Sequence, residues 1–163
     1  MVIDNDIKLQ EVLLNDLNSI IDEVTEKLLK NLQKSIQKEV YDAGTPIEYE
    51  RQGMDGGIQG SFETSTAVTM GNFIEAWIEQ DPMKMKLDKL NYIHGAYGQV
   101  PEDVRSILAE LIIEGTSWLR FGYGFWTEPR DFWGPFIEEL NKNGNKFIEQ
   151  AFKKRGIIYN KII

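Results

Sequence analysis

The chain has 163 residues, which fits one domain, and 42% of them are hydrophobic, enough to bury a core. A formal net charge of −8 disfavours a protein that grips nucleic acid, because an acidic surface repels phosphate. The lack of cysteine excludes disulfides, thiolate catalysis and cysteine zinc sites.

The segment from residue 9 to residue 41 predicts one long amphipathic helix. Apolar residues recur every three or four positions from Leu13 to Ile36, and Gly44 and Pro46 then supply a stop. Such a helix would be about 50 Å long. We therefore expect part of its apolar stripe to extend past the chain's own core toward another subunit. The alternative is an internal helix that lies across a sheet.

The ends of the chain carry no targeting or membrane signal that we recognise. The first residues have no basic segment followed by an apolar run, so we expect no signal peptide. No window holds 18 uninterrupted apolar residues, so we expect no transmembrane helix and no membrane partner.

A glycine-rich stretch follows the long helix. Four glycines fall between Gly53 and Gly60, which indicates an exposed loop, and the stretch lacks the pattern of a phosphate-binding loop. The candidate contact residues in this loop are Tyr49, Arg51, Gly53, Gly56 and Gly57.

Residues 59–80 predict a β-hairpin. Phe73, Glu75, Trp77 and Glu79 alternate with apolar neighbours, the period of two that is typical of a strand, and Gly71-Asn72 separates two such runs. Phe73 and Trp77 are the candidate contact residues of the hairpin.

The rest of the chain predicts two more helices, one aromatic loop and a tail. Pro101 opens a helix over residues 101–114 that Gly115 ends, and a last helix is expected over residues 134–155. Residues 156–163 form a short apolar tail, suited to an edge strand or to contact with a neighbour. The fold class is α+β: a long N-terminal helix and C-terminal helices packed on a small antiparallel sheet containing the hairpin, in a single domain over residues 1–163.

The aromatic loop over residues 116–133 has two interpretations. It seals the sheet against the last helix, or it anchors a protein–protein contact, where Trp, Tyr and Arg dominate. Its candidate interface residues are Trp118, Arg120, Phe121, Tyr123, Phe125, Trp126, Arg130, Phe132 and Trp133.

The chain offers little that resembles a catalytic apparatus. His94 is the single histidine and has no recognisable partner motif, so we assign no catalytic residue, no metal ligand and no cofactor, and we expect no enzymatic activity. The alternative of another class is a carbohydrate-active hydrolase that uses Glu114, Glu128 and Asp131 near the aromatic loop. Asp131 is equally well placed to cap the last helix. A third possibility is an adaptor that binds a peptide at the hairpin edge.

The chain carries three short motifs in order. They are Thr45, Pro46, Tyr49, Arg51 and Gly53, then Glu114, Gly115 and Thr116, then Pro129, Arg130, Phe132 and Phe136. These motifs and the order of the elements resemble the head–tail joining, or tail-completion, proteins of tailed bacteriophages and phage-derived tail particles. The chain departs from the common pattern by an insertion of Gly and acidic residues after Arg51 and a longer stretch between Gly115 and Pro129.

The resemblance implies a structural subunit of the virion neck, assembled in the bacterial host cytoplasm. It implies a homo-oligomeric ring, six- or twelve-fold, that contacts adjacent connector and tail proteins while DNA passes through the lumen without specific binding. A tail terminator and a head-closure protein are alternatives within the same class.

Overall fold

The computed structural model describes residues 6–43, 53–86, 105–115, 120–121, 124–125 and 128–158. They form two compact units, and each is described here by itself. Unit 1 comprises residues 1–29, 64–79 and 139–163, and unit 2 comprises residues 30–63 and 80–138. The long helix α1 (Asp6–Ile36) and the last helix α3 (Trp133–Lys154) contribute residues to both units.

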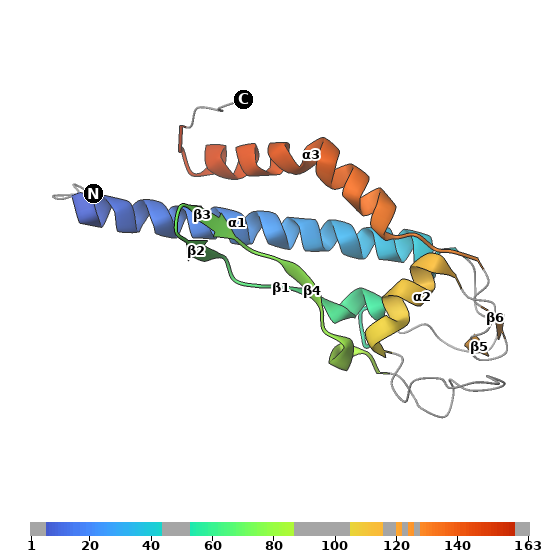
Figure 1. Ribbon diagram of the computed structural model, residues 1–163. Helices are drawn as coiled ribbons and strands as arrows, with labels where there is room; N and C mark the ends of the chain where they lie inside the picture. Colours follow the sequence, from blue (N-terminus) through green and yellow to red (C-terminus); the bar gives the residue numbers. More distant parts are fainter. Residues whose placement is uncertain are drawn as a thin grey trace. The chain divides into compact units, whose positions relative to one another are not determined.

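The architecture confirms the predicted α+β class, with a long N-terminal helix, a C-terminal helix and small antiparallel strand pairs (Figure 1). The first helix begins three residues earlier than predicted, and after Ile36 it continues as a π-helix, Gln37–Tyr41. No described helix is long and apolar enough to cross a membrane.

In unit 1, α3 runs antiparallel to α1 (Figure 1). Ile20 and Val24 of α1 are buried against Ala151 of α3, and further apolar side chains surround these three. The periodicity of both helices explains the contact, because positions three and four residues apart lie on one face. The residues that complete this cluster are Leu28, Phe147, Ile148, Phe152 and Ile157.

The hairpin is a two-stranded ribbon with one interruption. Strand β1 (Phe62–Thr64) pairs with β4 (Ile78–Gln80), and β2 (Val68–Met70) pairs antiparallel with β3 (Phe73–Glu75). Gly71 has φ +61° at the first central position of the turn, where a type II′ turn places glycine. Between the two pairs, the backbone N–H of Trp77 donates to the Ser65 hydroxyl (2.9 Å) instead of to a carbonyl.

Unit 2 packs around Phe132, which is completely buried and meets Phe62 edge to face at 6.3 Å between ring centroids. Burial of such a ring contributes about 2–3 kcal/mol. The other buried apolar residues of this unit are Leu32, Ile36, Val40, Ile58, Met85, Leu108, Ile112 and Phe136. They come from segments far apart in the chain, which is why the unit holds together without a large sheet.

Short elements complete unit 2. A 3₁₀ helix at Ile58–Ser61 precedes β1, and another at Pro82–Lys84 follows β4. A third at Arg105–Ile107 leads into α2 (Leu108–Glu114), so the described part of the predicted 101–114 helix is α-helical only from Leu108. Within the predicted aromatic loop, β5 (Arg120–Phe121) pairs with β6 (Gly124–Phe125).

Candidate functional site

The last two motifs of the resemblance meet in unit 2. Gly115 ends α2 with φ +73°, and a Cβ placed there would lie 2.8 Å from the backbone nitrogen of Pro129. The backbone N–H of the next residue, Arg130, donates to the Ile112 carbonyl (2.9 Å). The turn at Pro129 is therefore fastened directly to the end of α2, and this close approach requires glycine at position 115.

Arg130 and Asp131 fasten the same turn to two other elements. The Arg130 guanidinium donates to the Val40 carbonyl (2.9 Å) near the end of the π-helix. The Asp131 carboxylate accepts from the backbone N–H groups of Trp133 (3.0 Å) and Gly134 (2.8 Å) and so caps α3. The predicted capping role of Asp131 is confirmed.

Phe132 requires a correction. We predicted it as an interface residue, but its side chain has no exposed surface, and its backbone carbonyl accepts from the Ser35 hydroxyl (2.6 Å). The Phe132 ring belongs to the hydrophobic core. The neighbouring Trp133 remains substantially exposed and packs on Phe136, with 5.4 Å between ring centroids. Trp133 is the aromatic-loop candidate whose described side chain lies at the surface.

The other aromatic candidates are only partly described. Arg120, Phe121 and Phe125 belong to the β5–β6 pair, in which Arg120 lies opposite Phe125 and Phe121 opposite Gly124. Trp118, Tyr123 and Trp126 lie outside the described residues, as do Tyr49, Arg51 and His94.

The glycine loop is more tightly packed than predicted. We expected an exposed loop, but Gly56 is buried, and Gly57 and Gly60 both donate backbone hydrogen bonds to the Gly53 carbonyl (3.1 and 3.3 Å). A Cβ at Gly56 would clash with the Lys86 side chain, and one at Gly57 would lie 2.3 Å from the Tyr41 hydroxyl. The glycines allow close packing within unit 2, so their described role is structural.

One face of the hairpin presents large apolar side chains to solvent. The register pairs Met70 with Phe73 and Val68 with Glu75, and directly paired residues point to the same face. Val68, Met70 and Phe73 are all exposed, and so is Trp77, which lies between β3 and β4. Phe73 and Trp77, the candidate contact residues of the hairpin, are thus accessible to a partner, and their role in a contact stays a prediction.

The opposite face of the hairpin holds the contacts with α1 inside unit 1. The Thr69 hydroxyl lies 3.2 Å from the Asn18 amide oxygen, and the Ala67 backbone N–H donates to the Asp22 carboxylate (2.6 Å). Ile74 pairs with Thr69 and shares its face, where it is half-buried, while Glu75 pairs with Val68 on the exposed face. The exposed face of the hairpin therefore carries apolar side chains beside an acid.

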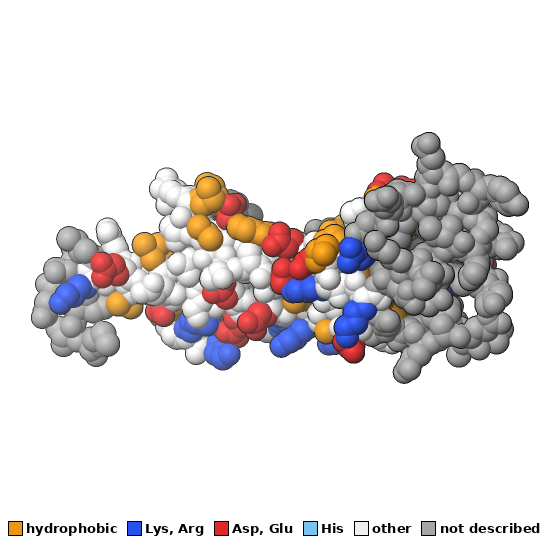
Figure 2. Space-filling view, turned by 90° about the horizontal axis from the view of Figure 1, so that it is seen from below, with side chains coloured by type: hydrophobic (Ala, Val, Ile, Leu, Met, Phe, Trp, Pro, Cys, Tyr) orange, Lys and Arg blue, Asp and Glu red, His pale blue; other side chains and the backbone are white. Residues whose placement is uncertain are grey.

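The N-terminal part of α1 carries a second exposed apolar group in unit 1. Leu9 and Leu13 continue, by steps of four, the stripe that Leu17 and Ile20 carry toward α3, but they are exposed. Val12 is exposed beside them, and Leu14 is exposed on the side of α1 that carries Asn18. Orange side chains stand out near the N-terminal end of α1 and over the hairpin in Figure 2. The expectation that the stripe extends past its own core holds for these described residues.

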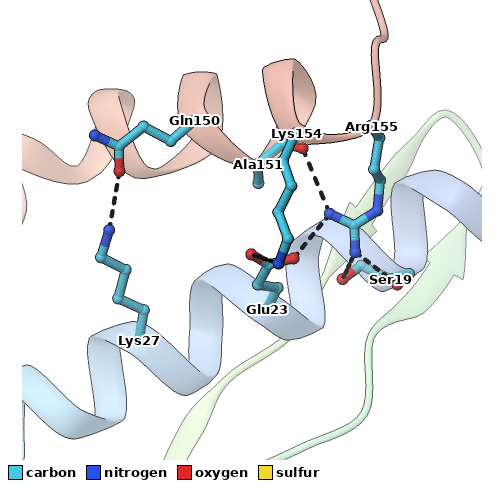
Figure 3. A network of polar contacts seen from close by, with 7 residues as sticks. All are labelled: Ser19, Glu23, Lys27, Gln150, Ala151, Lys154 and Arg155. Atoms are coloured by element: carbon cyan, nitrogen blue, oxygen red, sulfur yellow. Dashed lines mark hydrogen bonds and ion pairs between the residues drawn. The ribbon is translucent and has the colours of Figure 1, made fainter.

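A polar network fastens α1 to α3 in unit 1 (Figure 3). The Glu23 carboxylate accepts from Lys154 and from Arg155, each at 2.9 Å, and Arg155 also donates to the Ser19 hydroxyl at 2.9 Å. Hydrogen bonds from Lys154 and then Arg155 hold the pKa of the Glu23 carboxyl below its ordinary value.

One turn along the helix, Lys27 makes two contacts with α3. Its ammonium group donates to the Gln150 side chain (3.0 Å) and lies 4.0 Å from the centroid of the Phe147 ring. These polar contacts therefore accompany the apolar contact between α1 and α3 along its length. They fix how the two helices are aligned along each other.

The structure describes all three acids of the hydrolase alternative, and Glu128 is exposed beside the contact between Gly115 and Pro129. Asp131 is occupied as a helix cap, and Glu114 is the last residue of α2. Among the described residues, no group of three or more His, Asp or Glu is arranged to hold a metal ion. The capping role leaves Asp131 poorly placed to transfer protons to a substrate, which weakens this alternative.

Comparison with known proteins identifies the class. A family model, YomN, matches residues 6–155, and the chain therefore belongs to the YomN family. This is a Bacillus phage-derived family, so the protein is phage-related, as the resemblance implied at its coarsest level. No curated protein and no solved structure shows a significant match.

Proposed function

We propose that this protein is a structural subunit of the phage neck, a tail-completion or head–tail joining protein that forms a ring around the DNA channel. It has no catalytic step in this proposal. Tail terminator and head-closure protein are the alternatives within the class. Membership of a phage-derived family supports the phage context.

The observation that carries the proposal is the meeting of the motif residues in unit 2. Gly115 is crowded by Pro129, Arg130 reaches the Val40 carbonyl, and Phe132 fills the core. These residues carry the resemblance to head–tail joining proteins, and in this chain they act together as one packing centre.

Charge and surface agree with a ring through which DNA moves. The formal net charge of −8 favours a lumen to which DNA does not adhere. The exposed apolar groups of the hairpin and of α1 favour a protein that is covered by neighbours in its working state.

The test is deletion of the coding sequence from the phage genome that carries it, followed by electron microscopy of the lysate. We expect DNA-filled heads and separate tails that do not join, with joining restored by the wild-type chain supplied in trans. Fully joined, infectious particles in the deletion strain would contradict the proposal. Restoration by the Asp131→Asn variant, which keeps a cap but removes the acid, would also separate the structural role from the hydrolase alternative.

A further inference from the structure

The N-terminal part of α1 exposes one face that combines apolar side chains with an acid. Positions 9, 12, 13 and 16 follow the spacing of three and four residues that keeps side chains on one side of a helix. Leu9, Val12 and Leu13 are 38–44% exposed. Asp16 is half-buried among them. We call these four residues the helix face.

The charge of Asp16 is not balanced within the described chain. Its carboxylate forms no ion pair with a described residue, and the residues three and four positions away on α1 include no base. Glu23, further along α1, differs because it accepts from Lys154 and Arg155. A segment that covers the helix face should therefore bring apolar side chains together with one positive charge, since an acid buried without a partner is costly.

Residues 159–163 have this combination. They read Tyr-Asn-Lys-Ile-Ile, with three apolar side chains, one base at Lys161 and no acid. These five residues lie outside the described part of the chain. The described chain leads into them through Ile158, whose side chain is 95% exposed, and beyond α3 it runs away from α1 (Figure 1). This direction favours contact with another copy of the protein over contact with its own α1.

We infer that residues 159–163 of one copy bind the helix face of the next copy, with Lys161 beside Asp16. The inference rests on the proposed function and names a contact that would help to build its ring. Five extended residues span about 17 Å. The helix face from Leu9 to Asp16 spans about 10 Å, so the segment is long enough to cover it.

The contact is head to tail. Each copy gives residues 159–163 to one neighbour and offers its helix face to the other, and such a heterologous contact closes into a ring when its rotation allows. The apolar side chains supply the attraction, and the pairing of Lys161 with Asp16 selects the position of the segment on the face.

The experiment uses disulfide formation between copies, because the natural chain has no cysteine. One full-length variant, Leu13→Cys, supplies the helix face. A second, size-tagged variant, Ile163→Cys, supplies the segment. The two are mixed in a glutathione redox buffer, and the linked heterodimer is measured on a non-reducing gel.

Leu14→Cys is the matched control for the helix face. Leu14 is 41% exposed, close to the 44% of Leu13, but lies on another side of α1. We expect several times more heterodimer with Leu13→Cys than with Leu14→Cys. Circular dichroism melting checks that every variant is folded.

A charge exchange between the two copies tests the pairing of Lys161 with Asp16. Asp16→Lys in the Leu13→Cys copy should lower the yield of heterodimer, because two positive charges then meet. Lys161→Asp in the Ile163→Cys copy should restore it. A merely structural effect of Asp16→Lys on α1 would not be restored by a change in the other copy.

Three results would overturn the inference. Equal yields from Leu13→Cys and Leu14→Cys would show that the segment does not recognise the helix face. Failure of the charge exchange to restore the yield would show that Lys161 does not lie beside Asp16. A double variant with Leu13→Cys and Ile163→Cys in one chain should give linked dimers and larger species, so a linked monomer as its main product would mean that the chain covers its own helix face. Each of these results leaves the proposed neck function standing, which the deletion experiment tests separately.

Discussion

Single polar atoms fix the turn between α2 and α3. One carboxylate oxygen of Asp131 accepts two of the backbone N–H groups that the start of α3 would otherwise leave without partners. Asp131→Ala should lower the free energy of unfolding by about 1 kcal/mol. Asp131→Asn, which can accept the same bonds, should cost less. Chemical denaturation measures both, and equal losses would show that the cap is not the cause.

The conformation and close packing of Gly115 allow a second prediction about a single residue. Gly115→Ala combines an unfavourable positive φ with a clash against Pro129, while Gly71→Ala at the hairpin turn has a positive φ with no atom within 4 Å. Gly71→Ala is therefore the control for φ alone, with an expected cost of about 1 kcal/mol. Gly115→Ala should cost clearly more, by about 1–3 kcal/mol. Equal losses in denaturation would contradict the close approach to Pro129.

The two parts of one helix stripe behave differently at the scale of an element. Ile20 is fully buried against α3, while Leu13, two turns earlier on the same stripe, is exposed. Ile20→Ala should therefore lower the free energy of unfolding by about 2–4 kcal/mol, and Leu13→Ala should change that of the monomer by about 0.5 kcal/mol or less. A large loss at Leu13 in a monomeric sample would mean that another part of the same chain covers this side chain.

The contact of α1 with α3 should respond to pH through Glu23. Its pKa in the folded protein lies below the ordinary value, because Lys154 and Arg155 donate to its carboxylate. The contact therefore stabilises the fold above the ordinary pKa of a glutamate, and this contribution is lost as the pH falls through the lowered value.

Comparison with Glu23→Gln isolates that effect. The melting temperature of the variant should lie below that of the wild type at neutral pH, and the two should converge as the medium becomes acidic. The difference should also shrink in high salt, since the pair is partly exposed to solvent. A difference that stays constant from neutral to strongly acidic pH would show that the Glu23 charge is not responsible.

At the scale of the whole molecule, periodicity was sufficient to predict the two long helices, α1 and α3. The apolar stripe placed the start of α1 within three residues and that of α3 within one, because steps of three and four have one structural explanation. Asp131 as a cap and Gly71 as a turn were predictable for the same local reason.

The remaining features depend on partners far away in the chain. Burial of Gly56 requires Lys86, and burial of Phe132 requires Phe62 and the segment around Ser35. A sequence read locally gives no account of such pairs, so it predicted an exposed loop and an exposed ring. The outward direction of Phe73 also followed from hairpin register, which an alternating pattern leaves open between two faces.

The division into two units follows from the way α1 is used. One continuous stripe supplies Ile20 to the core of unit 1 and Leu32 to that of unit 2, so helix periodicity does not reveal where one core ends. The prediction of a single domain stays a prediction. A single domain should unfold in one cooperative transition, and calorimetry would test this.

Labelling of purified particles tests the central claim, a subunit of the neck, most directly. Particles assembled with an epitope-tagged chain are treated with gold-conjugated antibody and examined by electron microscopy. Gold concentrated at the junction of head and tail, with the chain present in several copies per particle by quantitative mass spectrometry, is the result we predict. Intact particles that lack the chain, or gold confined to the head shell or the distal tail, would contradict the account.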